Sequence, residues 1–230
     1  MREPAPPLFF DREAAGEELA RELKRLRLHP PVLVLALPRG GLPVAVPIAR
    51  ELGAALDVLV VRKIAMPGDP ELAIGAIAPG AVYEPSPLSG RMISPDAMRA
   101  LVRREQTELE RRERLYRAGR PPLDLRRKTV VLVDDGLATG ATMLAAVRAA
   151  RTAGATTVIV AAPVASREAL DLVDREASAT VILQQPAGFL AVGQFYQRFE
   201  QVADAAVCRA LASCDAEANA KVTAQSFRRS

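Results

Sequence analysis

The stretch TVVLVDDGLATGATMLAAVRAA, residues 129–150, joins a continuous apolar run to a helical pattern through one short turn. A continuous apolar run of this length is typical of a strand that is buried on both faces of a parallel sheet. Two neighbouring acids, Asp134 and Asp135, follow where that strand ends. The pattern therefore predicts two carboxylates at the carboxyl end of a strand, directly before a helix.

The turn after the acids has the composition of a phosphate-binding loop. A helix N-terminus presents unpaired backbone N–H groups and the positive end of the helix dipole. Gly140 lets the backbone approach an anion closely, and Thr139 and Thr142 add hydroxyl donors. The carboxylates of Asp134 and Asp135 would repel a phosphate, but they suit hydroxyl groups or a hydrated Mg²⁺. The pattern thus predicts a ligand with vicinal hydroxyls beside a phosphate, as in ribose 5-phosphate.

Two other interpretations of this stretch stay open on the residues alone. Asp and Thr are common helix caps, so the turn could be an ordinary strand–turn–helix connection. The acid pair could also form a Mg²⁺ pocket like that of a receiver domain.

The remaining sequence predicts alternating strands and helices. Apolar runs indicate further strands at 31–37, 55–64, 156–162 and 181–185. Helical periodicity and caps indicate helices at 11–28, from the PRGG turn to Gly53, at 95–117 after an N-cap at Ser94, and at 142–153, 166–176 and 202–212. Such alternation predicts right-handed crossovers and a mostly parallel sheet. The Gly- and Pro-rich segment 65–94 interrupts it and predicts a hairpin or flap.

Two more loops are expected at the edge of the sheet that carries the acids, because ligands of such sheets bind beyond the carboxyl ends of the strands. The first is PRGG, where Arg39 precedes Gly40 and Gly41 and can pair with an oxyanion. The second holds Arg62 and Lys63 at the end of the strand predicted at 55–64, where an anion would account for two cations. The alternatives are a tight turn with an exposed arginine, and a sheet edge protected by charge.

These motifs resemble those of a known family. VVLVDDGLATGAT matches position by position the signature of the type I phosphoribosyltransferases, which is an apolar strand, two acids, two or three variable residues and TGxT. The resemblance covers about 31–185. The chain is also similar to uncharacterised bacterial predicted phosphoribosyltransferases that share LPRGG, VRKI, ELAIGAI and a closing FY-x-x-F. The resemblance implies a Rossmann-like three-layer α/β fold in one domain, 1–212, with a flap near 65–94 and a hood near 186–200. The tail from 213 to 230 is polar and is expected to be loosely ordered.

The resemblance implies a transfer of ribose 5-phosphate from phosphoribosyl pyrophosphate (PRPP) to a nitrogen of a nucleobase-like acceptor. Asp134 and Asp135 would hold the ribose hydroxyls and, indirectly, Mg²⁺. The implied 5-phosphate site is Ala138, Thr139, Gly140, Ala141 and Thr142. The implied pyrophosphate site is Arg39, Gly40, Gly41, Arg62 and Lys63, with a cis peptide at Pro38–Arg39; Arg39, Lys63, Asp134 and Asp135 would be catalytic.

The acceptor side is less well defined. Four aromatic residues are candidates for stacking on a base, namely Phe189, Phe195, Tyr196 and Phe199, and plain packing of a lid is the alternative. Many purine enzymes of the family carry an acidic general base where this chain has Ala138, so a proton acceptor must come from elsewhere, with Glu71 and Glu84 as candidates. Tyr83 and Arg91 of the flap are further candidate contributors. A regulator that senses PRPP or a nucleotide without turnover is the alternative function, and a Mg²⁺-dependent phosphohydrolase is a third.

Composition limits the other function classes. The formal net charge of +4 is too small to argue for a nucleic-acid scaffold, and the run RREQTELERRERLYR interleaves Glu with Arg as a solvated helix face does. No apolar segment approaches the length of a membrane helix, and no signal peptide is evident. Cys208 and Cys214 are expected to be reduced thiols. We therefore expect a cytoplasmic protein, with a homodimer suggested by the resemblance.

Overall fold

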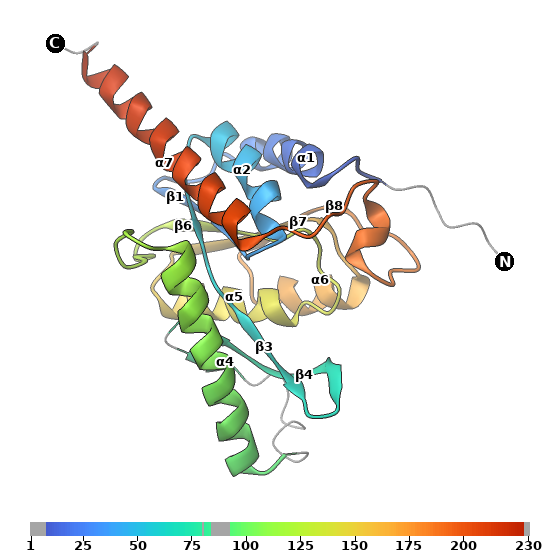
Figure 1. Ribbon diagram of the computed structural model, residues 1–230. Coiled ribbons are helices and arrows are strands. Elements are labelled where there is room, and N and C mark those ends of the chain that lie inside the picture. The colour runs from blue at the N-terminus through green and yellow to red at the C-terminus, as the bar shows by residue number, and fades with distance from the viewer. Residues whose placement is uncertain (1–7, 80, 84–92, 228–230) are drawn as a thin grey trace.

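The computed structural model describes residues 8–79, 81–83 and 93–227, and it describes side chains there except at 69–73, 81–83 and 218–227. Five parallel strands form the central sheet in the order β2-β1-β6-β7-β8 (Figure 1). They are β2 (Ala55–Val58), β1 (Val32–Ala36), β6 (Thr129–Val133), β7 (Thr157–Val164) and β8 (Ala179–Gln184). The predicted parallel sheet is confirmed, and β6 has the predicted bounds.

Helices cover both faces of this sheet. On one face lie α1 (Arg12–Arg25) and α2 (Gly41–Leu52); on the other lie α5 (Ala141–Thr152) and α6 (Arg167–Asp174) (Figure 1). Each face has its own cluster of buried Val, Leu, Ile and Ala side chains. All five residues of β6 are buried because both faces of the strand are covered. The predicted three-layer α/β architecture is therefore confirmed.

A second, antiparallel sheet stands beside the first. It consists of β3 (Arg62–Met66), β4 (Asp69–Ala78) and β5 (Ala81–Tyr83), and α4 (Pro95–Tyr116) runs along it (Figure 1). The hairpin overlaps the segment predicted as a flap, 65–94: β4 lies within it, and β3 begins before it at Arg62. Residues 84–92, with Glu84 and Arg91, lie outside the described residues, as do the side chains of Glu71 and Tyr83.

The prediction of one continuous strand at 55–64 is wrong. The parallel ladder ends at Val58, with Leu59 N donating to Ala36 O at 3.0 Å, because the partner strand β1 ends there. The chain then leaves the sheet and begins β3 at Arg62. The sequence does not reveal this break, because the chain stays buried as it leaves the sheet. Val58, Leu59 and Val60 are all apolar and buried.

The C-terminal helix α7 (Asp204–Phe227) is longer than predicted. The sequence predicted an end at Ala212 and a loosely ordered segment beyond it, whereas the helix continues to Phe227. Residues 213–227 contain no Gly or Pro and are rich in Ala, so nothing in them stops a helix. Two ion pairs attach this part to the body, Arg120–Asp215 at 2.6 Å and Arg50–Glu217 at 2.7 Å. Cys208 and Cys214 are free thiols.

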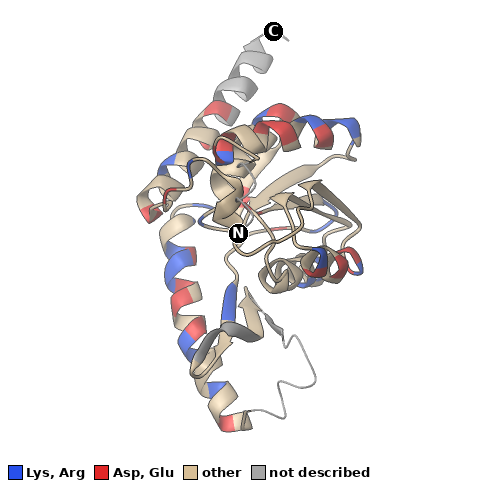
Figure 2. Cartoon of the chain, turned by 90° about the vertical axis from the view of Figure 1, so that its right-hand side faces the viewer, with Lys and Arg blue, Asp and Glu red and all other residues tan. Residues whose placement is uncertain are grey.

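Charges on α4 are interleaved as the sequence predicted (Figure 2). Glu108 pairs with both Arg111 and Arg112 at 2.7 Å, and Glu110 pairs with Arg114 at 3.9 Å. The two arginines lower the pKa of Glu108 to about 2. These arginines are therefore balanced by acids of their own helix, which agrees with a solvated helix face.

Candidate active site

The loop after β1 and the loop after β6 lie side by side at one edge of the sheet. The two strands are neighbours in register, with Ala36 opposite Val133, and Leu37 N donates to Val133 O at 2.8 Å. The loop after β1 contains the cis peptide Pro38–Arg39, as the resemblance implied. The sheet therefore brings the PRGG loop and the acid pair together, as predicted.

Gly40 and Gly41 are required by this contact between loops. A Cβ at Gly40 would lie 2.0 Å from Asp135 Oδ2, and one at Gly41 would lie 2.4 Å from Val133 O. The sequence predicted that these glycines give an anion access to the backbone. The structure adds a steric reason, because any larger residue would push the loop away from the acids.

The two acids are partly withdrawn from solvent. The Asp135 side chain is 15% exposed, and Asp134 Oδ1 accepts a hydrogen bond from Asp135 N at 2.9 Å. Burial raises the pKa of Asp134 well above its usual range, and the neighbouring carboxylate of Asp135 raises it further. Burial also raises the pKa of Asp135, against the opposing effect of the Arg12 guanidinium. Such a pair favours a ligand that donates hydrogen bonds or carries positive charge.

Arg12 and Tyr196 hold Asp135, and sequence reasoning missed Arg12 altogether. Arg12 Nε donates to Asp135 Oδ2 at 2.8 Å, and the Tyr196 hydroxyl donates to Asp135 O at 2.6 Å. Arg12 begins α1, 123 residues before its partner, in a stretch with no distinctive motif. The expected hood at 186–200 had placed Tyr196 near the site, whereas no motif pointed to Arg12.

The loop of residues 138–142 at the start of α5 is the one predicted to bind a phosphate, and we call it the cradle. Gly140, the N-cap of α5, is left-handed at φ 74° and has no side chain to cap the helix. The Thr139 hydroxyl accepts a long hydrogen bond of 3.5 Å from Ala141 N, so Thr139 and the first amides of α5 lie together at the helix N-terminus. Ala138 and Thr139 are exposed, and Ser166 Oγ fixes the loop by donating to Ala138 O at 2.6 Å. A Cβ at Gly140 would meet Ala169 O at 3.0 Å, so this position needs glycine for both conformation and space.

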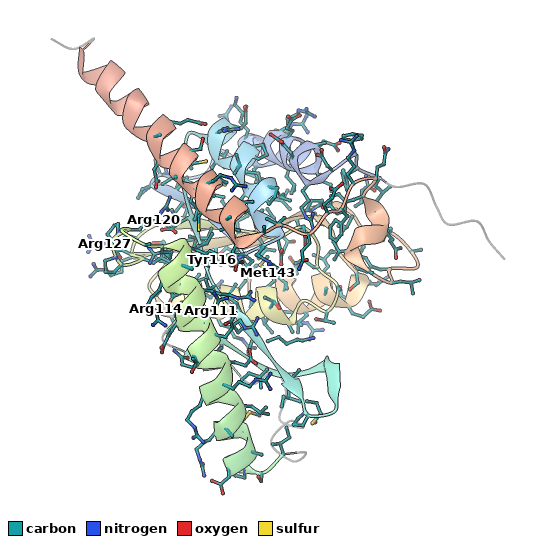
Figure 3. All side chains as sticks on the ribbon, viewed as in Figure 1. Arg111, Arg114, Tyr116, Arg120, Arg127 and Met143 are labelled. Carbon is teal, nitrogen blue, oxygen red and sulfur yellow. The ribbon has the colours of Figure 1, made fainter. Side chains whose placement is uncertain are left out.

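Arg39 faces an open cavity of about 440 Å³ between the PRGG loop, α1, α4 and the segment before α7. Its Nη1 lies 3.6 Å from Asp204 Oδ1, and Asp204 also accepts from the Tyr116 hydroxyl at 2.6 Å. Burial and this hydrogen bond raise the pKa of Tyr116 to about 12. Tyr116 and Arg111 lie on the part of α4 nearest the start of α7 (Figure 3). The cavity is lined by Arg12, Arg39, Gly40, Arg112, Asp135, Phe199, Gln201 and Val202.

Arg62 and Lys63 do not lie at the end of a strand of the main sheet. The prediction that placed them there is wrong. Both lie at the start of β3, because the chain leaves the parallel sheet before reaching them. Arg62 Nη2 forms an ion pair with Glu105 Oε2 of α4 at 2.6 Å. Lys63, by contrast, forms no ion pair with a carboxylate among the described residues.

The predicted acceptor aromatics are mostly part of the core. Phe195 and Tyr196 are 6% and 5% exposed and pack with Phe9. Phe189 is half-buried, with its ring 4.9 Å from that of Phe195. The packing alternative therefore describes Phe195 and Tyr196 better than a stacking face does. Phe199 is the aromatic that lines the cavity, where the Arg12 guanidinium lies 3.7 Å from its ring centre.

The acid pair fits a hydrated Mg²⁺ by its chemistry. Magnesium prefers oxygen ligands and keeps several waters or phosphate oxygens, so one or two carboxylates suffice. A nearby cation would offset the repulsion between the two neighbouring carboxylates, which together with burial raises the pKa of Asp134. No group of three or more Asp, Glu, His or Cys gathers among the described residues, so a cation here would depend on ligands from a substrate.

The phosphoribosyl transferase domain family matches residues 10–189. That range contains Arg12, the PRGG loop, the acid pair and the cradle before α5. The chain belongs to this family. No helix in the described part of the chain has the length and hydropathy needed to cross a membrane.

Relatives agree with this assignment. Two Mycobacterium tuberculosis proteins, from strains CDC 1551 / Oshkosh and ATCC 25618 / H37Rv, are each 44% identical over 199 residues and are named "Putative phosphoribosyl transferase". The match covers 86% of this chain and 45% of each relative, so the chain spans about half their length. The crystal structure of TT1426 from Thermus thermophilus has a TM-score of 0.77 at 42% identity, covering 88% of this chain and 97% of that one.

Proposed function

We propose that this phosphoribosyl transferase domain moves ribose 5-phosphate from PRPP to a nitrogen of a nucleobase-like acceptor, with release of pyrophosphate. The observation that carries the proposal is the adjacency of the acid pair, the open start of α5 and the PRGG loop. A sugar phosphate with a pyrophosphate on C1 presents a diol, a tail phosphate and a polyanion. These three groups match the three parts of the site in chemistry.

In this proposal, each part of PRPP has its own residues. Asp134 and Asp135 accept hydrogen bonds from the ribose hydroxyls. The loop of residues 138–142 surrounds the 5-phosphate with backbone N–H groups and the hydroxyls of Thr139 and Thr142. Arg39 and Lys63 neutralise the pyrophosphate, and the Gly40 amide donates to it. Gly41 contributes by its lack of a side chain, because its amide already donates to Leu37 O at 3.1 Å. Arg62 takes a supporting role, because Glu105 already occupies its guanidinium.

Charge development explains the choice of residues. As the bond from C1 to pyrophosphate lengthens, the ribose ring becomes cation-like and the leaving group gains negative charge. The acid pair stabilises the ring, and the cations stabilise the leaving group. Mg²⁺ bound to substrate oxygens near Asp134 and Asp135 would supply further positive charge to the pyrophosphate.

The acceptor would enter through the cavity beside Phe199. Its lining combines an aromatic ring, an amide and an apolar side chain, from Phe199, Gln201 and Val202, with guanidinium groups opposite. Ala138 carries no proton acceptor, so we keep Glu71 and Glu84 as candidate bases. The flap carrying β3 and β4 would exclude water during transfer.

A second candidate is a regulator that binds PRPP or a nucleotide without turnover. It is favoured by two ion pairs, Arg12–Asp135 at 2.8 Å and Arg39–Asp204 at 3.6 Å. Each engages a residue that transfer would need. An enzyme would have to free Arg39 from Asp204, although Arg12 could stay on Asp135 during transfer. A sensor could use both contacts as its ligand-free state.

One assay separates the candidates. The protein is incubated with PRPP, Mg²⁺ and each of a panel of purine and pyrimidine bases, and pyrophosphate release is followed. Release that depends on one base supports transfer and gives the acceptor. Tight binding of PRPP by calorimetry without release supports the sensor, and release without any base indicates hydrolysis. Absence of both binding and release contradicts all three.

Mg²⁺ dependence, a cytoplasmic location and a homodimer complete the proposal. Removal of divalent cations with EDTA should abolish pyrophosphate release, and Mg²⁺ should restore it. Sedimentation of the purified protein tests the homodimer. Fractionation of the source cells tests the location.

A further inference from the structure

Asp135 depends on three parts of the chain that are far from it in sequence. Two donate hydrogen bonds to it, and the third leaves space for its carboxylate. Arg12 Nε donates to its Oδ2 at 2.8 Å, and the Tyr196 hydroxyl donates to its backbone O at 2.6 Å. The absence of a side chain at Gly40 leaves room for the carboxylate, since a Cβ there would lie 2.0 Å from Oδ2. Together these contacts fix both the backbone and the side chain of this one acid.

Arg12 is itself immobilised. Its Nη1 donates to Glu200 O at 3.0 Å, and its guanidinium lies 3.7 Å from the centre of the Phe199 ring. Its side chain is only 11% exposed. Every contact of a long, mostly buried side chain restricts its rotamers, so Arg12 offers Asp135 a donor at a fixed point.

Two chain segments, 8–10 and 195–198, bring these partners to the same acid. Leu8 N and Phe9 N donate to Phe195 O at 2.9 and 3.0 Å. In return Gln197 N donates to Phe9 O and Arg198 N to Phe10 O, both at 2.9 Å. The first segment leads into α1 and Arg12, and the second carries Tyr196 (Figure 1). We call this pair of segments the terminal clasp.

We propose that Arg12, assisted by Tyr196, is a positioning residue that orients Asp135 for the ribose hydroxyls of the substrate. The inference rests on the proposed function. The terminal clasp then links formation of the ribose site to the docking of both ends of the domain. Arg12 acts through Asp135 and does not itself need to touch the substrate.

Two alternative roles of Arg12 predict different effects on stability and ligand affinity. A purely structural role would make Arg12 matter for stability and not for ligand affinity. The second alternative is a direct contact of Arg12 with pyrophosphate, because Arg12 lines the same cavity as Arg39. That contact would matter for PRPP and not for ribose 5-phosphate, which lacks pyrophosphate.

The test measures binding of ribose 5-phosphate and of PRPP, each with Mg²⁺, by titration calorimetry. The variants are Arg12→Gln, Arg12→Lys and Tyr196→Phe. The matched control is Arg198→Gln, because Arg198 lies in the same clasp and its guanidinium lies 4.7 Å from the Phe10 ring centre without an ion pair to the site. Thermal unfolding of each protein is followed by circular dichroism.

We expect Arg12→Gln to weaken both ligands by the same factor, on the order of 10- to 100-fold, since small misplacements in a site have effects of this size. Arg12→Lys should recover part of the loss by keeping the charge. Tyr196→Phe should weaken both ligands to a smaller extent, and Arg198→Gln should bind like the parent protein.

Unchanged affinity in Arg12→Gln overturns the inference, and so does a loss confined to PRPP. If Arg12→Gln does not fold, Tyr196→Phe decides, with equal loss for both ligands in support and unchanged binding against. A parent protein that binds neither ligand overturns the proposed function together with this inference. Binding by the parent with no change in the variants overturns the inference alone.

Discussion

Gly40 and Asp135 are in such close contact that a Cβ on Gly40 would lie 2.0 Å from Asp135 Oδ2. The backbone of Gly40, at φ −62° and ψ −35°, is one that any residue can adopt. Space, and not conformational freedom, is therefore what requires glycine here. The PRGG loop and the acid pair thus behave as one structural unit.

Gly40→Ala should weaken binding of PRPP by at least about tenfold, because a displaced loop or carboxylate loses aligned contacts. Calorimetric titration with PRPP measures the change. The control is Gly53→Ala, where φ is 60° and nothing lies within 4 Å of the new Cβ. That variant should lose about 1–2 kcal/mol of stability and no affinity. Equal affinity in both variants would contradict the steric argument.

Asp134→Asn should weaken ribose 5-phosphate binding while leaving the melting temperature unchanged or higher. A neutral amide removes a buried charge whose pKa is raised by burial and by Asp135, yet its oxygen can still accept from Asp135 N. The lost charged hydrogen bond should reduce the binding free energy by about 1.5–3 kcal/mol. Titration calorimetry and thermal unfolding check the two effects, and parent-like affinity would argue against the ribose assignment.

Arg39→Gln should weaken PRPP much more than ribose 5-phosphate, because only PRPP presents pyrophosphate. The loss should be about 1.5–3 kcal/mol for PRPP, the range of a hydrogen bond to a charged group. Arg111→Gln is the matched control, since Arg111 Nη2 reaches the same Asp204 at 4.0 Å from outside the PRGG loop. An equal loss for both ligands in Arg39→Gln would place Arg39 away from the pyrophosphate.

Ser166→Ala should weaken ribose 5-phosphate binding and reduce stability by about 1 kcal/mol, the typical effect of losing an N-cap. Ser166 Oγ accepts from Ala169 N at 3.0 Å as the cap of α6, and it donates to Ala138 O in the cradle. Ser94→Ala removes the cap of α4, where Ser94 Oγ accepts from Ala97 N at 3.3 Å. That control should lose stability alone. Urea unfolding and calorimetry separate the two effects.

Asp57→Asn should strongly destabilise the fold without changing ligand affinity. Asp57 accepts from Arg117 Nε and Nη2 at 3.1 and 3.0 Å, and Arg120 Nη1 lies 3.2 Å away. Removing one charge from a buried network of this kind costs about 3–5 kcal/mol. Asp124→Asn breaks an exposed pair with Arg126 and should leave the stability almost unchanged, because solvent screens such a pair. Equal midpoints in urea would show that the Asp57 network is not a stability determinant.

Several elements were predictable because their signals are local. The apolar run Thr129–Val133 has its predicted bounds as β6, Ser94 is the N-cap of α4, and Gly53 ends α2 with a left-handed residue. The acids and the TGxT turn follow β6 directly, so their place at the sheet edge required only the parallel order of strands. The PRGG loop joined them for the same reason.

Other features depended on partners that the local sequence does not contain. The parallel ladder of β2 ends where β1 ends, which no pattern within 55–64 could reveal. Phe195 and Tyr196 have the composition of a stacking face, but contact with Phe9 buries them. Arg62 was predicted at the end of a strand of the main sheet. Because the chain leaves that sheet first, Arg62 instead forms an ion pair with Glu105.

The sequence by itself determined the alternation of helices with the strands of the main sheet and the residue types of the PRGG loop and of the turn after β6, since periodicity, caps and turn residues act over a few neighbouring positions. The tertiary structure alone decided that Arg12 pairs with Asp135, 123 residues away, and that Gly40 must be small to admit that carboxylate. Contacts of this kind depend on how close separate segments come after packing, and packing is a property of the whole chain.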